Sequence, residues 1–468
     1  MTVESAAKVK AKKIPSPSKS NSFWLGLTLS NPKAINALTH EMILELKSHF
    51  TLAAQDPQIL GIFFDGDGEK GFCAGGDVRT LASRVTKNPL QAAQFFKDEY
   101  EFDYQVHLFP KPLVIWGHGV VMGGGFGIFQ GASFRLLTTD SKVAMPELAI
   151  GLFPDVGATF FLGTLPKKLG LFLGLTGARL TPRDCAELGL CEGIFEPSHK
   201  EKFLESLIAA TSFEEVFQCV DAQKIQNLDN LPFNQELFTV VPSLLENASS
   251  LNELDAHWRT LLHRKPNPLS DWLKNALDNY FQGCPFSAAI TFRQMTYEAS
   301  RLSLRDCFLL EGRLMPALAA RSDFMEGVRA RLIDKDNKPQ WSPQNLNSLE
   351  ASQVSEIFNV AHLKKLGIEW ELNLPEEIYG TKIPAPWKKC DAHSIKATFK
   401  FKNHVEAFAA MQSISELAEK SNHHPEWTNV YNRLDIRLTT HDAAPRVGGK
   451  LTLKDIHLAK KISDLIPF

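Results

Sequence analysis

The chain has 468 residues, which is too long for one ordinary hydrophobic core and predicts two or three domains. Its 51 Lys and Arg residues nearly balance 53 Asp and Glu residues, and the formal net charge of -2 excludes a basic surface for nucleic acid. Hydrophobic residues make up 44% of the chain and charged residues 22%, which is typical of a folded globular protein rather than a disordered one.

The cysteines and the N-terminal residues bear on the compartment. The 7 cysteines are an odd number, scattered without a C-x-x-C pair, which excludes a zinc ribbon or a disulfide framework and suits a reducing environment. Residues 1–20 contain five lysines but no apolar core, so they are no secretory signal, and a mitochondrial presequence would favour arginine. We therefore expect a flexible basic arm over residues 1–20 and a cytoplasmic protein rather than one of the mitochondrial matrix.

Short apolar runs alternate with helical patterns over residues 23–200. Residues 60–65 (LGIFFD) and 112–116 (PLVIW) are predicted to be buried strands, each followed directly by glycine. A helix is predicted after Thr39, a candidate N-cap, because apolar residues recur behind it at helical spacing. This alternation predicts an α/β layer built from βαβ units.

The chain beyond these units lacks strand patterns over residues 203–322, where residues 287–301 and 304–318 are predicted to be helical. Prolines on either side of a glycine predict a linker at residues 375–386. The longest uncharged stretch, residues 112–134, is rich in glycine and would make a poor spanning helix, so no membrane segment is expected.

The chain after the linker reads as strand, helix, strand and helix, at residues 397–401, 404–420, 430–440 and 453–466. This order predicts a small α+β domain. We therefore expect two domains, at residues 21–374 and 387–468.

Two glycine-rich turns follow predicted strands, at residues 73–77 (CAGGD) and 122–125 (MGGG). Glycines at a strand-to-helix turn allow backbone N–H groups to approach a ligand at the positive end of a helix. A tight turn or close helix–sheet packing is the structural alternative for one such turn. Neither matches a P-loop or a clean G-x-G-x-x-G. Two such turns with acids nearby favour a binding or catalytic site.

Several motifs in one order resemble the crotonase superfamily of acyl-CoA enzymes: residues 31–38 (NPKAINAL), 72–77 (FCAGGD) and 118–125 (HGVVMGGG). Residues 145–157 and 322–336 are similar to the 3-hydroxyisobutyryl-CoA hydrolase branch. The resemblance covers residues 23–366. It implies an α/β crotonase-like domain, a ββα spiral, with a helical C-terminal extension.

This resemblance implies roles for five residues. The backbone N–H groups of Gly76 and Gly124 would form the oxyanion hole of thioester hydrolysis. Glu147 would be the general base or the nucleophile, two roles that the sequence leaves open. Asp155 would face the acyl group, and Glu99 would contact the substrate. Helix capping, an ordinary turn and a solvated helix face are the structural alternatives for the three acids.

One departure distinguishes hydrolysis from hydration. Enoyl-CoA hydratases carry a second catalytic Glu just past the glycine triplet, where this chain has Gly127, which cannot transfer a proton. Hydrolysis of a short β-hydroxyacyl-CoA thioester is therefore favoured, with 3-hydroxyisobutyryl-CoA of valine catabolism as the expected substrate. An enoyl-CoA hydratase or isomerase is the alternative.

The C-terminal run of residues 419–432 (EKSNHHPEWTNVYN) resembles pterin-4a-carbinolamine dehydratase, and the match extends over residues 387–466. The resemblance implies that His423, His424 and His441 bind a hydroxylated pterin and move its proton and hydroxyl. Adjacent histidine side chains diverge from the backbone, so acid–base chemistry is favoured over a metal site.

These patterns together predict a bifunctional enzyme that hydrolyses an acyl-CoA and dehydrates 4a-hydroxytetrahydrobiopterin. Neither reaction needs a metal or a redox cofactor, and no nucleic acid or membrane is expected as a partner. A homo-oligomer and a functional link to an aromatic amino-acid hydroxylase stay open. The alternative for the second domain is a binding or dimerisation module.

Overall fold

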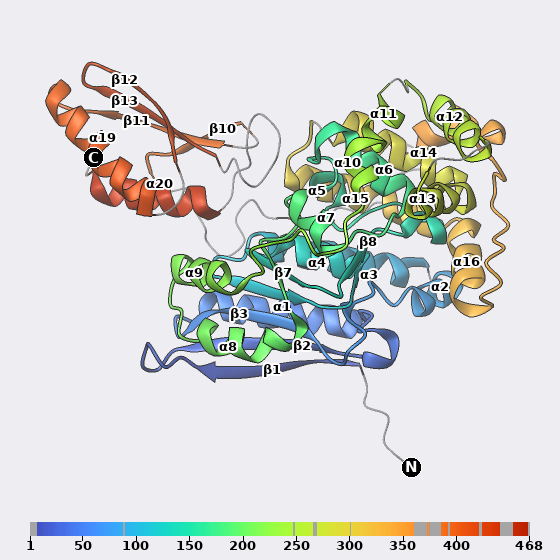
Figure 1. The fold of residues 1–468 in the computed structure, drawn as a ribbon, viewed down its shortest axis with the longest axis horizontal. Helices are drawn as coiled ribbons and strands as arrows, with labels where there is room; N and C mark the ends of the chain where they lie inside the picture. The colour runs from blue at the N-terminus through green and yellow to red at the C-terminus, as the bar shows by residue number, and fades with distance from the viewer. Residues whose placement is uncertain are drawn as a thin grey trace, which may run out of the picture. The chain divides into compact units, whose positions relative to one another are not determined.

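The structure, a computed structural model, describes residues 7–87, 89–246, 249–264, 269–299, 301–359, 372, 374, 385–391, 394–420, 424–439 and 453–466. The chain divides into two units, Met1–Leu374 and Pro375–Phe468 (Figure 1).

A six-stranded sheet forms the base of the larger unit, in the order β1-β2-β3-β5-β7-β9. β1 and β2 pair antiparallel, and the neighbours from β2 to β9 pair parallel. The predicted strands at residues 60–65 and 112–116 are confirmed as β3 and β5, whose residues are all buried. The strands are β1 (Lys8–Pro15), β2 (Phe23–Ser30), β3 (Ile59–Gly66), β5 (Leu113–Gly117), β7 (Phe134–Thr138) and β9 (Gly193–Phe195).

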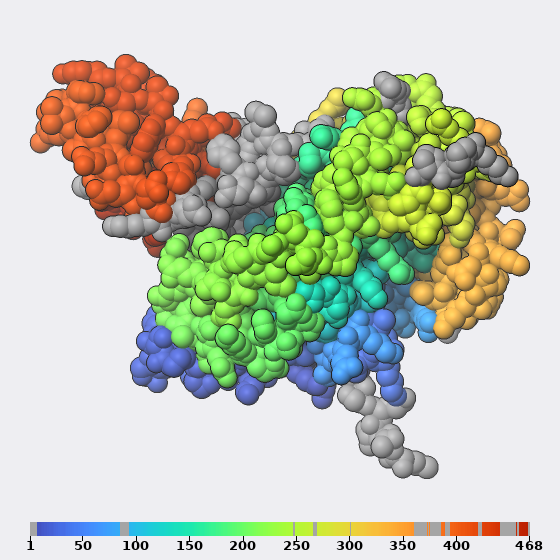
Figure 2. Space-filling view, in the orientation of Figure 1, coloured from blue at the N-terminus to red at the C-terminus, as the bar shows by residue number. Residues whose placement is uncertain are grey.

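Both faces of this sheet are covered. Phe63 belongs to the core cluster that joins the sheet to α8 (Lys200–Leu207) and α9 (Phe213–Gln223), and the green atoms of these helices cover that face in Figure 2. The next residue, Phe64, points to the opposite face, where its ring lies 6.3 Å from that of Phe50. Phe50 belongs to α1 (His40–Gln55), the predicted helix, and Thr39 caps it as expected.

A second, three-stranded sheet in the order β4-β6-β8 is parallel throughout. Its strands are β4 (Gly71–Cys73), β6 (Val120–Met122) and β8 (Lys142–Ala144), which follow β3, β5 and β7 in the chain. Three strands of the large sheet, β3, β5 and β7, are therefore each followed by a strand of the small one. The helices α2 (Val78–Lys87) and α4 (Gly124–Gly131) begin shortly after β4 and β6. This repeated ββα order confirms the predicted fold class of the larger unit.

The expected flexible arm over residues 1–20 is wrong for β1, which pairs with β2 along its whole length. Val9 is buried, and its backbone N–H donates to Glu45 Oε2 at 2.9 Å. Ile14 packs against the core cluster of the sheet. The lysines of β1 are exposed on this edge strand, where such residues are common. A lysine-rich composition therefore concealed an edge strand.

The helical extension is confirmed between residues 203 and 322, where the described residues contain no strand. The predicted helix over residues 287–301 is α14 with a π-helical continuation, η5 (Gln294–Glu298), and α15 covers residues 304–318. The helices are α10 (Gln235–Thr239), α11 (Val241–Leu245), α12 (Leu251–His263), α13 (Asp271–Gln282), α14 (Pro285–Arg293), α15 (Leu304–Ala319), α16 (Ser322–Val328) and, later in the chain, α17 (Ala351–Ile357).

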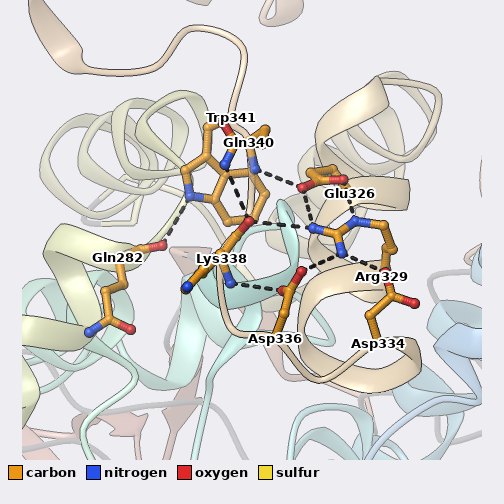
Figure 3. Close-up of polar contacts among 8 residues, drawn as sticks. All are labelled: Gln282, Glu326, Arg329, Asp334, Asp336, Lys338, Gln340 and Trp341. Atoms are coloured by element: carbon orange, nitrogen blue, oxygen red, sulfur yellow. Dashed lines mark hydrogen bonds and ion pairs between the residues drawn. The ribbon is translucent and has the colours of Figure 1, made fainter.

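Arg329 fastens the segment that follows α16 (Figure 3). Its guanidinium donates to Glu326 at 2.8 and 2.9 Å, to Asp334 at 2.6 Å and to Asp336 at 2.7 Å. The indole N–H of Trp341 donates to a backbone carbonyl at the end of α13 at 3.0 Å. Residues 334–341 are thereby fixed to α13 and α16.

The smaller unit contains an antiparallel sheet in the order β10-β11-β13-β12, with two helices. Its elements are β10 (Lys388–Asp391), β11 (Ser394–Lys400), α19 (His404–Lys420), β12 (Glu426–Val430), β13 (Arg433–Leu438) and α20 (Leu453–Leu465). Phe399 of the sheet, Ile414 of α19 and Ile462 of α20 meet in one buried cluster. This arrangement confirms the predicted α+β class.

The predicted single strand at residues 430–440 is wrong in detail, because a hairpin occupies this region. β12 and β13 pair antiparallel through a turn in which Tyr431 has a φ of 54°. β12 reads EWTNV and carries no regular apolar alternation, since it is an edge strand with exposed alternate residues.

None of the described helices is long and apolar enough to cross a membrane.

Gly151 and Gly189 both have a positive φ, but only Gly151 is also crowded by neighbouring atoms. Gly151 has a φ of 75°, and a Cβ there would lie 2.6 Å from the Asp323 carbonyl group. Gly189 has a φ of 68° with no atom within 4 Å of its Cβ position. Gly189→Ala should lower the free energy of unfolding by about 1 kcal/mol, and Gly151→Ala by about 3 kcal/mol because overpacking is added. Chemical denaturation of the full chain measures both, and equal losses would contradict the crowding at Gly151.

Candidate active site

The carboxyl ends of β4, β6 and β8 bring three motifs together. Parallel strands end at the same edge of a sheet, and here each is followed by a motif predicted to be functional. Gly76 follows β4, Gly124 follows β6, and Glu147 follows β8 at the start of η2 (Glu147–Ile150). The N–H of Gly123 donates to Ala144 O at 3.3 Å, which joins the second and third motifs directly.

The two predicted oxyanion-hole glycines are neighbours. A Cβ on Gly124 would lie 3.6 Å from the backbone nitrogen of Gly76, so the two glycines lie side by side. Gly124 is the first residue of α4, where helix N–H groups lack intrahelical acceptors. Within the described part of the chain, neither N–H donates to an acceptor. Two unused donors at a helix N-terminus suit an oxygen that gains negative charge.

Glu147 lies beside this pair of amides. Its side chain is buried, and its Oε1 lies 3.1 Å from the Cβ position of Gly123. Its Oε2 is buried without a hydrogen-bond partner among the described residues. Burial raises the pKa of the Glu147 carboxyl well above its usual range, and the Asp155 and Glu99 carboxyls raise it further. When it is ionised, the Glu147 carboxylate is therefore a stronger base than an ordinary carboxylate.

Glu99 reaches the same space from α3 (Pro89–His107). Its Oε1 lies 2.6 Å from the Cβ position of Gly124 and 3.7 Å from that of Gly76, so a side chain at residue 124 would displace it. Glu99 is buried, which excludes the solvated helix face as its environment. Burial raises the pKa of its carboxyl well above the usual range, and Asp155 adds to this effect.

Asp155 completes the group of acids and is tied to the same helix. The hydroxyl of Tyr100 donates to Asp155 Oδ2 at 2.6 Å, and both residues are buried. Burial raises the pKa of Asp155 from 3.8 to about 7, although this hydrogen bond lowers it. Sequence reasoning gave Tyr100 no role. Its place directly after Glu99 was the available signal.

Gly127 leaves no room for the second acid that hydratases place there. A Cβ at this position would lie 2.4 and 2.5 Å from side-chain atoms of Val156 and 2.9 Å from its carbonyl oxygen. Any side chain at residue 127 would therefore displace the turn that carries Asp155. The acids of this site come from α3, η2 and that turn instead.

Two more buried acids surround the site, and the sequence analysis missed both. Asp103 lies one turn after Glu99 on α3, fully buried, and neither of its carboxyl oxygens has a hydrogen-bond partner among the described residues. Glu311 of α15 is also fully buried. Burial raises the pKa of each, and the charged groups that raise it further are acids. The sequences of α3 and α15 give no local sign that these two acidic side chains point inward.

Of the three histidines predicted in the smaller unit, the structure describes His424. Its Nε2 lies 3.0 Å from Oε1 of Glu419, which belongs to the last turn of α19, and both side chains are exposed. His423 and His441 lie outside the described residues. The geometry around the histidines is therefore described only for this pair.

The family model for enoyl-CoA hydratase/isomerase matches residues 25–358. The chain belongs to this family. The model for pterin 4 alpha carbinolamine dehydratase matches residues 373–465. Both resemblances seen in the sequence are thereby confirmed, and the chain combines a crotonase-type domain with a pterin dehydratase domain.

Curated relatives of the family cover the larger unit. The chain is 36% identical to 3-hydroxyisobutyryl-CoA hydrolase, mitochondrial, of Danio rerio over 337 residues, which cover 71% of the chain and 86% of the relative. It is 34% identical to the Homo sapiens protein of the same name over 363 residues, covering 73% of the chain and 86% of the relative. These names place the relatives in mitochondria, so the expected cytoplasmic location gains no support.

Solved structures of the family share the fold. A carnitinyl-CoA dehydratase from Mycobacterium thermoresistibile matches with a TM-score of 0.67 and 27% identity over 78% of this chain and 99% of that one. An enoyl-CoA hydratase from Rhodobacter sphaeroides matches with a TM-score of 0.63 and 26% identity over 74% of this chain and 96% of that one.

The buried acids predict a pH-dependent stability. The raised pKa of Asp155, about 7, means that the folded chain holds a proton there that the unfolded chain releases. Its contribution to stability therefore falls as pH rises from about 4 to about 7. Asp155→Asn keeps an acceptor for Tyr100 and cannot ionise. It should raise the free energy of unfolding at pH 8, by up to about 4 kcal/mol, and change it little at about pH 4, near the carboxyl's ordinary pKa. Denaturation at both pH values measures this, and equal effects would refute it.

Proposed function

We propose that the larger unit hydrolyses a short β-hydroxyacyl-CoA thioester, with 3-hydroxyisobutyryl-CoA as the best candidate substrate. The observation that carries this proposal is the buried Glu147 carboxyl beside two unused backbone N–H groups, with no room for a second acid at Gly127. The relatives named 3-hydroxyisobutyryl-CoA hydrolase support the choice of substrate.

In this proposal the thioester carbonyl oxygen accepts hydrogen bonds from the N–H groups of Gly76 and Gly124. These donors stabilise the negative charge of the tetrahedral intermediate, a contribution of several kcal/mol in enzymes of this kind. The intermediate collapses by breaking the carbon–sulfur bond, and coenzyme A leaves as the thiolate. The space between the glycine turns positions the carbonyl before attack.

Glu147 supplies the attacking oxygen or activates it. As a nucleophile it forms an acyl anhydride that water then cleaves, and as a general base it takes a proton from water that attacks the carbonyl. Both routes give the free acid and coenzyme A. Asp155, held by Tyr100, binds the 3-hydroxyl of the acyl group or the water, and Glu99 contacts the substrate from the side of α3.

The smaller unit is proposed to dehydrate 4a-hydroxytetrahydrobiopterin. Loss of water from a carbinolamine needs an acid at the departing hydroxyl and a base at a ring nitrogen, which His423, His424 and His441 supply. The contact between His424 and Glu419 supports a role for the carboxylate in orienting the imidazole. A homo-oligomer and a link to an aromatic amino-acid hydroxylase belong to this proposal. Neither reaction as proposed draws on a metal or a redox cofactor.

The second candidate is an enoyl-CoA hydratase or isomerase fused to a binding module. The names of the two solved structures, a dehydratase and a hydratase, favour it. It predicts consumption of crotonyl-CoA without release of a thiol.

Glu147→Gln tests the first reaction. The wild type should release thiol from 3-hydroxyisobutyryl-CoA, and the variant should lose at least about 100-fold in kcat because the amide neither attacks nor takes a proton. A thiol reagent follows the release, with crotonyl-CoA assayed in parallel. Pterin dehydration by the same sample is the control and should be unchanged. Consumption of crotonyl-CoA without thiol release by the wild type would favour the hydratase.

Replacement of His423, His424 and His441 by Ala tests the second reaction. The triple variant should lose dehydration of 4a-hydroxytetrahydrobiopterin by at least about 100-fold, since general acid–base catalysis contributes this much. Its thiol release should match the wild type, which makes it the reciprocal control for Glu147→Gln. Undiminished dehydration would remove the histidines from the chemistry, and a wild type without dehydration would favour the binding module.

A further inference from the structure

The turn that carries Asp155 has an unfavourable backbone. Val156 has a φ of 52° and Gly157 a φ of 89°. A β-branched residue in the left-handed region is a genuine outlier, and such a conformation persists only when its surroundings fix it. The Val156 side chain also fills the space beside Gly127, so the turn cannot relax toward α4.

Glu311 of α15 holds this turn by three hydrogen bonds. Its Oε2 accepts from the N–H of Gly157 at 2.7 Å, and its Oε1 accepts from the N–H of Thr159 at 2.8 Å and from the Thr159 hydroxyl at 2.5 Å. The Glu311 side chain is fully buried. A buried acid with three donors around it is specific to one arrangement of the backbone that supplies them.

Gln294 of the π-helix η5 determines which atoms donate and which accept in these hydrogen bonds. Its Nε2 donates to Pro154 O at 2.9 Å, and a carbonyl can only accept, so the amide orientation is determined. The same Nε2 donates to the Thr159 hydroxyl oxygen at 2.5 Å, which leaves the hydroxyl proton for Glu311. Both oxygens of Glu311 therefore face donors. A glutamine in place of Glu311 would turn its NH₂ group, which is itself a donor, toward one of these donors.

We propose that Glu311 is a positioning residue that, together with Gln294, fixes the turn over residues 154–159 and thereby holds Asp155 against Tyr100 and beside the oxyanion hole. The role attributed to Asp155 rests on the proposed function. The inference assigns a task to the helical extension, because α15 and η5 supply both side chains that fasten the turn. Glu311 acts through Asp155 and does not touch the substrate.

A double-mutant cycle tests this role. Glu311→Gln should lower kcat by about 100-fold, as expected for a small displacement of a catalytic group, while KM for the acyl-CoA changes little. In the Asp155→Asn background the same substitution should cost less than about threefold, because the residue through which it acts is already lost. If Glu311→Gln lowers kcat by the same factor in both backgrounds, the proposal is overturned, since a general structural role does not depend on Asp155.

Asp184 provides a matched control. It is also fully buried and accepts three hydrogen bonds, from the N–H of Thr181 at 2.8 Å and from the backbone and side-chain nitrogens of Asn234 at 2.9 and 2.6 Å. Asp184→Asn should lower the thermal midpoint while kcat stays near the wild-type value. An equal loss of kcat in Asp184→Asn and Glu311→Gln would show that any buried anchor has this effect, and would overturn the inference.

Thr159→Val keeps the cycle usable if Glu311→Gln does not fold. It removes one donor to Glu311 and should show a smaller loss of kcat with the same dependence on Asp155. The cycle is measured on the thioester that the wild type converts, 3-hydroxyisobutyryl-CoA or crotonyl-CoA. Absence of thiol release by the wild type would therefore refute the hydrolase, whereas independence of the two substitutions would refute the positioning role.

Discussion

Backbone hydrogen bonds between the short parallel strands β4, β6 and β8 are the constraint on which the site depends. The strands are only three residues long, yet they align the turn at Gly76, the start of α4 at Gly124 and the start of η2 at Glu147. Amides and acid from three distant parts of the chain thereby share one edge. A side chain at residue 124 would displace the Glu99 carboxyl, whose Oε1 lies 2.6 Å from the Cβ position.

Burial of several acids beside these amides sets the electrostatics of the site. Glu99, Asp103, Glu147, Asp155 and Glu311 are all buried, and the charged groups that shift their pKa values are one another. Each ionisation therefore opposes the next, and hydrogen bonds from Tyr100 and from the turn over residues 154–159 are the compensation. The arrangement favours a basic carboxyl at Glu147 at the cost of stability.

The helical extension and the long helix α3 serve this arrangement from outside the sheets. α3 packs against α1, α4 and α15, and it supplies Glu99 and Tyr100 to the site. α15 supplies Glu311 to the turn of Asp155. The smaller unit has its own sheet and core, so the two chemistries proposed for this chain are housed in separately packed units. Within it, Nε2 of His424 lies 3.0 Å from Oε1 of Glu419.

The sequence by itself determined both families and the fold class of each unit, because local motifs and hydrophobic spacing carry this information. The resemblance then implied roles for Gly76, Gly124, Glu147 and Asp155. The sequence analysis misjudged β1 and β12, since edge strands rich in polar residues lack the apolar alternation of buried ones. Only the tertiary structure decided that Tyr100 donates to Asp155 and that Asp103 and Glu311 are buried. Which face of a helix points inward at a given residue depends on the packing of distant elements, and no local pattern encodes it.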